Sequence, residues 1–424
     1  MTDPEHLTAP AELVEALPDE PDVPLLREPA DGVPEPVISP PQLDDLVQRM
    51  RGGSGPIALD AERASGYRYS QRAYLVQLRR AGVGTALIDP IATPALSRLG
   101  TAIGDAEWIL HAANQDLPCL AELGMYPASL FDTELAGRLL GDERVALGTM
   151  VEQHLGVRLE KGHSAADWST RPLPHDWLVY AALDVELLID LRDVLADALH
   201  AEGKQEWARQ EFEAVRLAPA PAPRVEPWRR TSGIHKLRDR RQLATVRALW
   251  HARDDYAAQR DIAPGRILPD SAMVEAARVA PKRVGDLAEL PVYGGPRQRR
   301  QLSRWFEALE SARSLADDQL PTLTSTEPGD GIPAASRWRE RDPEAAERLA
   351  ACRAVVNAVA SEHTVLAQNL LASDVIRRLA WAPPKPADAD AVRARLAQLG
   401  ARPWQVDLTA DRLAATLATG GSGG

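Results

Sequence analysis

A run of alternating alanine and proline at residues 218–223 divides the chain and constrains its fold more than any other feature. By composition this run is a semi-rigid linker. Before it, short apolar runs alternate with helical patterns, whereas only helical patterns follow it. The length of 424 residues allows two to four domains with packed cores. We therefore expect a mixed α/β domain first and all-α domains after it.

The first half, residues 41–217, carries both strand and helix patterns. We predict strands at residues 57–62, 74–79, 85–89 and 108–111, and helices that begin near residues 41, 93, 115, 133, 148 and 174. Three closely spaced strands, followed by alternation with helices, predict a partly antiparallel sheet flanked by helices. Only this part of the chain has the pattern of an enzyme core.

The second half is helical from Trp228 onward. Apolar side chains recur at helical spacing in two places, Leu243, Val246 and Trp250, and then Leu302, Trp305 and Phe306. A polar break at residues 322–332 divides this half again. We predict a linker at 218–227, a helical domain at 228–318, a second linker at 319–340, a second helical domain at 341–418 and a flexible tail at 419–424.

The N-terminal residues 1–40 are rich in proline, aspartate and glutamate. Such a segment buries too little apolar surface to offset its ordering entropy, so we expect a disordered acidic tail. The formal charge of the whole chain is −12, which argues against nucleic-acid binding over the entire surface. A local basic patch remains compatible with this charge.

The two cysteines, Cys119 and Cys352, are far apart and have no ligand spacing. A zinc site or a disulfide framework is therefore not expected, and a reducing cytoplasm is the default location. No apolar run is long enough to span a bilayer, so we expect no membrane partner.

Two carboxylates, Asp60 and Glu62, follow the apolar run at residues 57–59. Side chains alternate along a strand, so both carboxylates lie on one face and could share a hard divalent cation. Asp132 and Glu134 repeat this spacing in front of a helical pattern, where Asp132 is better interpreted as a helix cap. Spacing alone is therefore not specific.

Further oxygen ligands come from two other segments. Asp116 follows a predicted strand and a polar loop, and Tyr180 and Asp184 are four residues apart on a predicted helix, hence on one face. Taken singly, Asp116 could be a helix N-cap, and Asp184 a solvated residue beside Tyr180. Together, the four carboxylates and the phenol could hold two Mg²⁺ or Mn²⁺ ions, roughly 4 Å apart, as phosphodiester hydrolysis requires.

In this order, the motifs resemble the three exonuclease motifs of the DEDD superfamily, in its tyrosine-bearing branch. The segment at residues 167–173 is similar to the one that precedes the third motif in ribonuclease D, and the helical blocks resemble HRDC (helicase and RNase D C-terminal) domains. The HRDC likeness rests on Ile267–Asp270 with Leu287 and Leu290, and more weakly on Asn369–Leu371. The resemblance, to ribonuclease D of the actinobacterial type, implies a ribonuclease H-like exonuclease domain followed by two HRDC-like domains.

The resemblance also implies roles for the residues. Asp60 would bridge two ions, Glu62 and Asp184 would complete the shell of one, Asp116 would hold the other, and Tyr180 would orient the attacking water. His111 and His163 are poor ligands for such ions and are interpreted as structural. The implied function is metal-dependent 3′-5′ hydrolysis of RNA to nucleoside 5′-monophosphates, with tRNA precursors as substrates.

Several basic residues are candidate phosphate contacts, with solvated surface charge as the alternative for each. Arg63 stands where the family often has a large apolar residue that wedges against the terminal base. The remaining candidates are Lys161, Arg171, Arg229, Arg230, Lys236, Arg240 and Arg241, and a second cluster contains Arg297, Arg299, Arg300 and Arg304.

Two other functions stay open at this point. The same chemistry could act on DNA, since nothing in the motifs recognises a 2′-hydroxyl. The chain could also be an inactive nucleic-acid-binding protein, although the intact acidic set argues against this reading.

Overall fold

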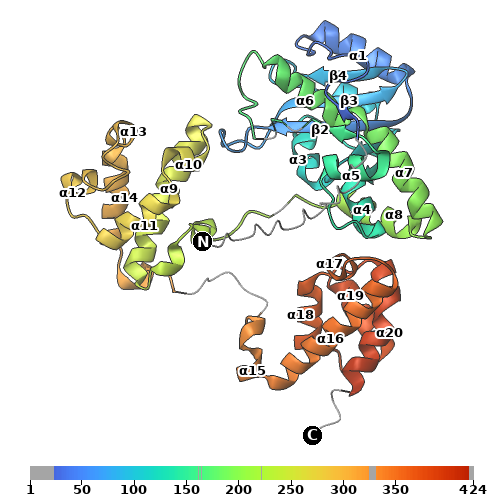
Figure 1. The fold of residues 1–424 in the computed structure, drawn as a ribbon. Coiled ribbons are helices and arrows are strands. Elements are labelled where there is room, and N and C mark those ends of the chain that lie inside the picture. The colour runs from blue at the N-terminus through green and yellow to red at the C-terminus, as the bar shows by residue number, and fades with distance from the viewer. Residues whose placement is uncertain (1–22, 161, 164, 221, 324–330, 420–424) are drawn as a thin grey trace, which may run out of the picture.

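A computed structural model describes residues 23–160, 162–163, 165–220, 222–323 and 331–419 (Figure 1). Lys161, the N-terminal residues 1–22 and the end of the chain from residue 420 lie outside the described residues. Within the described ranges, no helix combines the length and apolar character needed to cross a membrane.

The first domain is built on a five-stranded mixed sheet with the order β4-β3-β2-β5-β6. Strands β2 and β3 are antiparallel, as are β3 and β4, whereas β5 runs parallel to β2 and β6 parallel to β5. The strands are β2 (Ser54–Arg63), β3 (Ala73–Ala81), β4 (Gly84–Ile88), β5 (Glu107–Leu110) and β6 (Ser129–Asp132). This mixed sheet confirms the predicted fold class, and β6 is the strand that the sequence pattern did not predict.

Helices flank this sheet, and α6 and α7 contact its strands directly. The central strand β2 is covered on both sides, so Ile57, Ala58 and Leu59 are fully buried. The helices are α1 (Pro40–Gly52), α2 (Ser97–Ala102), α3 (Leu117–Glu122), α4 (Thr133–Leu140), α5 (Leu147–Leu155), α6 (His175–Glu186), α7 (Leu188–Ala201) and α8 (Gln205–Arg216), with a 3-10 turn η1 (Ala113–Gln115) before α3.

The described part of the N-terminal segment, residues 23–39, is packed against the first domain. Strand β1 (Leu25–Leu26) pairs in parallel with β7 (Arg158–Leu159), and Val37 forms a bridge with Ile88. The expected disorder is therefore wrong for these residues. A few apolar side chains, such as the buried Val37, find partners on the domain although the average composition is acidic.

The second domain is a separate bundle with its own core. Leu249, Met273, Tyr293 and Trp305 are buried together at its centre. Its helices are α9 (Arg240–Arg260), α10 (Pro264–Ile267), α11 (Asp270–Val279), α12 (Val284–Ala288), α13 (Pro296–Arg299) and α14 (Leu302–Ser314), after the 3-10 turns η2 (Pro227–Arg230) and η3 (Ile234–Lys236) and before η4 (Asp317–Gln319).

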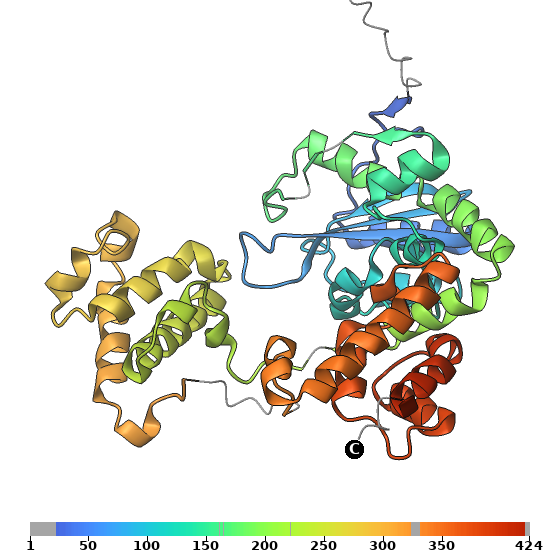
Figure 2. The ribbon, with the colours of Figure 1, turned by 60° about the horizontal axis from the view of Figure 1, so that its bottom comes forward.

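The C-terminal domain shares one continuous core with the first domain. Trp404 stacks on Trp207 with ring centroids 4.8 Å apart, and its indole nitrogen donates to Glu211 at 2.9 Å. Figure 2 shows these helices beside the first domain, with the second domain to one side. They are α15 (Trp338–Arg341), α16 (Pro343–Glu362), α17 (Ala367–Leu370), α18 (Ser373–Trp381), α19 (Ala389–Gln398) and α20 (Pro403–Thr419), after a 3-10 turn η5 (Ala335–Arg337).

Candidate active site

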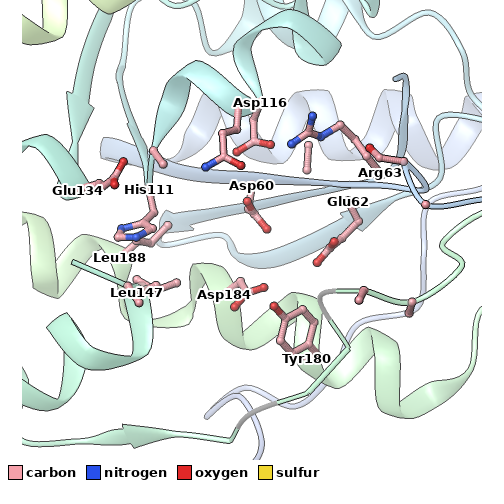
Figure 3. A pocket seen from close by; sticks show the side chains of 18 of the residues that line it. Asp60, Glu62, Arg63, His111, Asp116, Glu134, Leu147, Tyr180, Asp184 and Leu188 are labelled. Atoms are coloured by element: carbon pink, nitrogen blue, oxygen red, sulfur yellow. The ribbon is translucent and has the colours of Figure 1, made fainter. Parts of the chain in front are cut away.

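The five residues of the predicted acidic set all line one cavity of about 650 Å³ (Figure 3). Asp60 and Glu62 project from β2, Asp116 lies between η1 and α3, and Tyr180 and Asp184 project from α6. The fold thus brings together side chains from three segments that are far apart in the sequence.

Strand alternation directs the β2 carboxylates into this cavity. Leu59 and Ala61 are buried on the opposite face, while Asp60 and Glu62 point toward α6 (Figure 3). The register places Gln77 of β3 opposite Asp60, and its amide nitrogen donates to Asp60 Oδ2 at 3.4 Å. Sequence reasoning missed Gln77 because a partner across the sheet is set by strand register.

Asp60, Glu62 and Asp184 can place one carboxylate oxygen each so that all three atoms lie within 4.8 Å of one another. Asp116 is not part of this tight group but faces the same cavity. Among the described residues, no lysine or arginine forms an ion pair with any of the four. Buried carboxylates without a cation are costly, and oxygen-only ligands fit a hard divalent ion.

Burial shifts the protonation of all four carboxylates in the same direction. It raises the pKa of Glu62 to about 10, with further increases from the charges of Asp60 and Asp184. Burial likewise raises the pKa values of Asp60, Asp116 and Asp184, the last two also through the charge of Asp60. Without a bound cation Glu62 therefore holds a proton at neutral pH, so a metal has to displace that proton on binding.

Tyr180 is a neutral phenol in this setting. Burial raises its pKa, and the neighbouring carboxylates of Asp184 and Glu62 raise it further. Its ring lies beside Trp168, at a centroid distance of 6.3 Å, and meets the His163 ring edge-on at 6.2 Å. Tyr180 can therefore donate or orient a hydrogen bond in the cavity but is not an ionised base.

Asp132 caps α4, as predicted, and also holds the loop that leads to Asp116. Its carboxylate accepts hydrogen bonds from the backbone nitrogens of Glu134 and Leu135 in α4. It also accepts from the nitrogens of Ala112, at 3.2 Å, and Ala113, at 2.8 Å. This second connection requires the end of β6 to lie beside the end of β5, which the sequence pattern did not reveal.

His111 has the structural role that its residue type suggested. Its Nδ1 lies 2.9 Å from the Thr133 hydroxyl, and burial lowers its pKa to about 4. The ring is therefore neutral at physiological pH. Other cavity-lining residues were not recognised from the sequence: Ser65, Gly66, Gln115, Glu134, Val145, Leu147 and Leu188.

The candidate phosphate contacts divide into two groups. Arg63 lines the cavity, whereas the guanidinium of Arg171 is fully used inside the protein. It donates to both carboxylate oxygens of Asp89, at 2.6 and 2.9 Å, and to the carbonyl oxygens of Tyr74, Trp168 and Thr170. Arg171 has no donor left for RNA, so its expected role as a phosphate contact is wrong.

Part of the first basic cluster is also used within the protein. Arg229, Arg240 and Arg241 donate to backbone oxygens at residues 313–322, where the chain leaves the second domain. The sequence could not predict this because the accepting carbonyls lie about eighty residues away. Arg230 and Lys236 are exposed.

Three protein-family models match the chain. The one described as 3′-5′ exonuclease matches residues 34–200, the HRDC domain matches 242–309, and the 3′ to 5′ exonuclease C-terminal domain matches 331–417. The HRDC match confirms that assignment for the first helical block. The last block is matched by the C-terminal domain model, where we expected a second HRDC-like domain.

The chain is similar to curated ribonuclease D proteins. It is 30% identical to that of Gluconacetobacter diazotrophicus over 364 residues, which cover 83% of this chain and 88% of the relative. It is 32% identical to that of Zymomonas mobilis over 315 residues, which cover 70% and 79% of the two chains.

Solved structures agree with these matches. A crystal structure of a protein from Bifidobacterium adolescentis has a TM-score of 0.86 at 37% identity and covers 93% of this chain and 100% of that chain. Ribonuclease D from Escherichia coli, described as an exoribonuclease involved in structured RNA processing, has a TM-score of 0.65 at 25% identity, with 91% and 98% covered.

Proposed function

The chain belongs to the ribonuclease D family and is a 3′-5′ exoribonuclease, and we propose that its reaction takes place in the cavity between β2 and α6. The observation that carries this proposal is the group of Asp60, Glu62 and Asp184, whose oxygens approach within 4.8 Å of one another and form no ion pair with a lysine or arginine among the described residues. Asp116 and Tyr180 complete the set.

We further propose that the cavity holds two divalent ions, Mg²⁺ or Mn²⁺. Asp60 belongs to the tight group and lies between Asp184 and Asp116 in Figure 3, which suits it to bridge both ions. Glu62 and Asp184 would complete the shell of one ion, and Asp116 would hold the other. When bound, such ions lower the pKa of the attacking water and stabilise the leaving oxygen.

Tyr180 would position the attacking water through its hydroxyl group. Its raised pKa keeps the phenol protonated, so it serves as a hydrogen-bonding group. The carboxylates would direct hydrolysis to the last phosphodiester bond, with release of a nucleoside 5′-monophosphate. Structured RNA ends, such as those of tRNA precursors, are the substrates we propose.

A direct test compares the wild type with Asp60→Asn on a 5′-labelled RNA. We expect a loss of at least about a thousandfold in kcat, because a bridging ligand of this kind supports several kcal/mol of transition-state stabilisation. Excess chelator should abolish activity, and Mn²⁺ or Mg²⁺ should restore it. The matched control is Asp105→Asn, at an exposed position two residues before β5.

A matched DNA strand belongs in the same experiment. Faster hydrolysis of DNA than of RNA would contradict the RNA preference but leave the site intact. Full activity of Asp60→Asn, or activity in excess chelator, would contradict the proposed site itself.

A further inference from the structure

The loop between β2 and β3 forms one wall of the active-site cavity. Its residues Ser65, Gly66 and Tyr67 line the cavity next to Arg63. The same loop extends away from the sheet toward the second domain, as the blue segment in Figure 2 shows. One surface of the loop therefore faces the substrate, and another faces the helical domain.

The helical domain holds this loop through the segment between α9 and α10. The backbone nitrogen of Ala263 donates to the Tyr67 carbonyl oxygen at 2.9 Å. The carboxylate of Asp261 accepts from the Ser70 nitrogen at 2.8 Å and from the Tyr74 hydroxyl at 3.3 Å. These contacts fix the position of the α9–α10 segment at the mouth of the cavity.

Arg266 of α10 lies directly against the cavity wall. Its Nε donates to the Gly66 carbonyl oxygen at 2.7 Å, and its guanidinium carbon lies 3.9 Å from the centroid of the Tyr67 ring. The side chain is exposed, and its two terminal nitrogens have no acceptor in the described part of the protein. Four N–H donors are thus left without an acceptor from the described residues.

The positive charge of Arg266, at the rim of this cavity, can attract an RNA phosphate. Metal ions held by the four carboxylates would act on the scissile phosphate, so a phosphate outside the cavity needs another cation. A planar guanidinium that is already held by stacking can bind a phosphate through two parallel hydrogen bonds. Its location at the rim suits a phosphate that has not yet entered the cavity.

We propose that Arg266 binds a backbone phosphate of the RNA on the 5′ side of the nucleotides in the cavity, so that the helical domain forms part of the substrate-binding mouth. This inference rests on the proposed function of the cavity. The surface continues outward along α13, because the Gln298 side chain donates to the carbonyl oxygen of Ile267. Arg297 and Arg299 of α13 and Arg300 just after it are exposed, and their side chains form no hydrogen bond or ion pair within the described residues.

The test distinguishes two roles of Arg266, binding a phosphate through its charge and holding the β2–β3 loop in place. Arg266→Gln removes the charge but keeps an amide that can donate to the Gly66 oxygen. Two twelve-nucleotide RNAs are compared, one with natural phosphates and one with neutral methylphosphonate linkages at the three positions 5′ of the scissile bond. The matched control is Arg278→Gln, on an exposed arginine near the end of α11 whose side chain pairs, among the described residues, only with Glu275.

For natural RNA, we expect Arg266→Gln to raise KM about tenfold with kcat within twofold, as for the loss of a charged hydrogen bond. The slope of log KM against log salt should fall by about 0.7. With the neutral linkages, KM of Arg266→Gln and wild type should agree within twofold, and Arg278→Gln should match wild type on both RNAs.

Two results would overturn the proposal. An unchanged KM on natural RNA would show that Arg266 does not bind the substrate. An equal loss on both RNAs would assign Arg266 to holding the loop instead. Failure of the proposed function is distinguishable from both, because the wild type itself would then not hydrolyse the natural RNA.

Discussion

Glu62 is buried between β2 and α6 with two other carboxylates beside it, and this burial determines how the site responds to pH. Its pKa rises from 4.5 to about 10 in the folded protein. Between these two pH values, the folded state without metal therefore binds more protons than the unfolded state. Ionising Glu62 costs stability as the pH rises, and a bound cation removes that cost.

We accordingly expect metal affinity to increase with pH between 6 and 8, by about tenfold per pH unit for each proton displaced. Titration calorimetry with Mn²⁺ in two buffers of different ionisation enthalpy measures the protons released. Glu62→Gln should release about one proton fewer than wild type. A metal affinity that does not change with pH would contradict this account.

Asp132 is a second residue whose effect can be measured. Four backbone nitrogens donate to its carboxylate, two in α4 and two, of Ala112 and Ala113, where η1 begins. We expect Asp132→Ala to lower the free energy of unfolding by about 2–3 kcal/mol through the lost cap and the unpaired nitrogens. It should also raise the Mg²⁺ concentration for half-maximal activity, because the loop carries Asp116.

Urea denaturation and a metal titration of activity test these two effects of Asp132→Ala. Asp132→Asn retains one acceptor oxygen and should recover most of the stability. A variant that loses stability but keeps the wild-type metal requirement would show that Asp132 does not position Asp116.

At the level of elements, the long strands and the acidic motifs could be predicted from the sequence. The short edge strand and the contacts between segments far apart in the sequence could not. β2 carries three consecutive buried residues before Asp60, so its strand pattern is strong. β6 has only four residues at the sheet edge, with Leu130 and Phe131 as its apolar signal. Arg171 was misread because its acceptors depend on where distant segments lie in the fold.

Gly141, the residue after α4, connects the first domain to the C-terminal domain. Its φ is +90°, and an added Cβ would lie 2.7 Å from the Thr364 carbonyl oxygen. Gly156 ends α5 with φ +66° but has open space around it. The two glycines share a left-handed backbone and differ in whether another domain is close.

Gly141→Ala should therefore destabilise the protein by about 2 kcal/mol or more, and Gly156→Ala by about 1 kcal/mol. Denaturation curves of both variants give the difference, which measures the close contact with Thr364. If both variants lowered the free energy of unfolding equally, the contact with Thr364 would not contribute to the effect of Gly141→Ala.

At the level of the whole molecule, the cores do not follow the order of the chain. The first and C-terminal domains share one core, whereas the second domain has its own core around Leu249 and Trp305. The contacts between the second domain and the β2–β3 loop are mostly polar. We therefore expect two cooperative unfolding units: the first and C-terminal domains together, and the second domain by itself.

Scanning calorimetry should resolve two transitions. Trp305→Ala should lower the Tm of only the second domain, since a buried tryptophan contributes about 3–5 kcal/mol to its own core. Trp404→Ala should lower the other transition, in which the first and C-terminal domains unfold together. A single transition that both variants shift equally would contradict this division.

The shared core also has a consequence for synthesis of the protein on the ribosome. Trp207 packs on Trp404, so its partner emerges almost two hundred residues later, after the whole second domain has been translated. The nascent first domain exposes this apolar surface throughout that interval and is open to aggregation or chaperone binding. The nuclease therefore completes the core of its first domain only after its C-terminal domain has been translated.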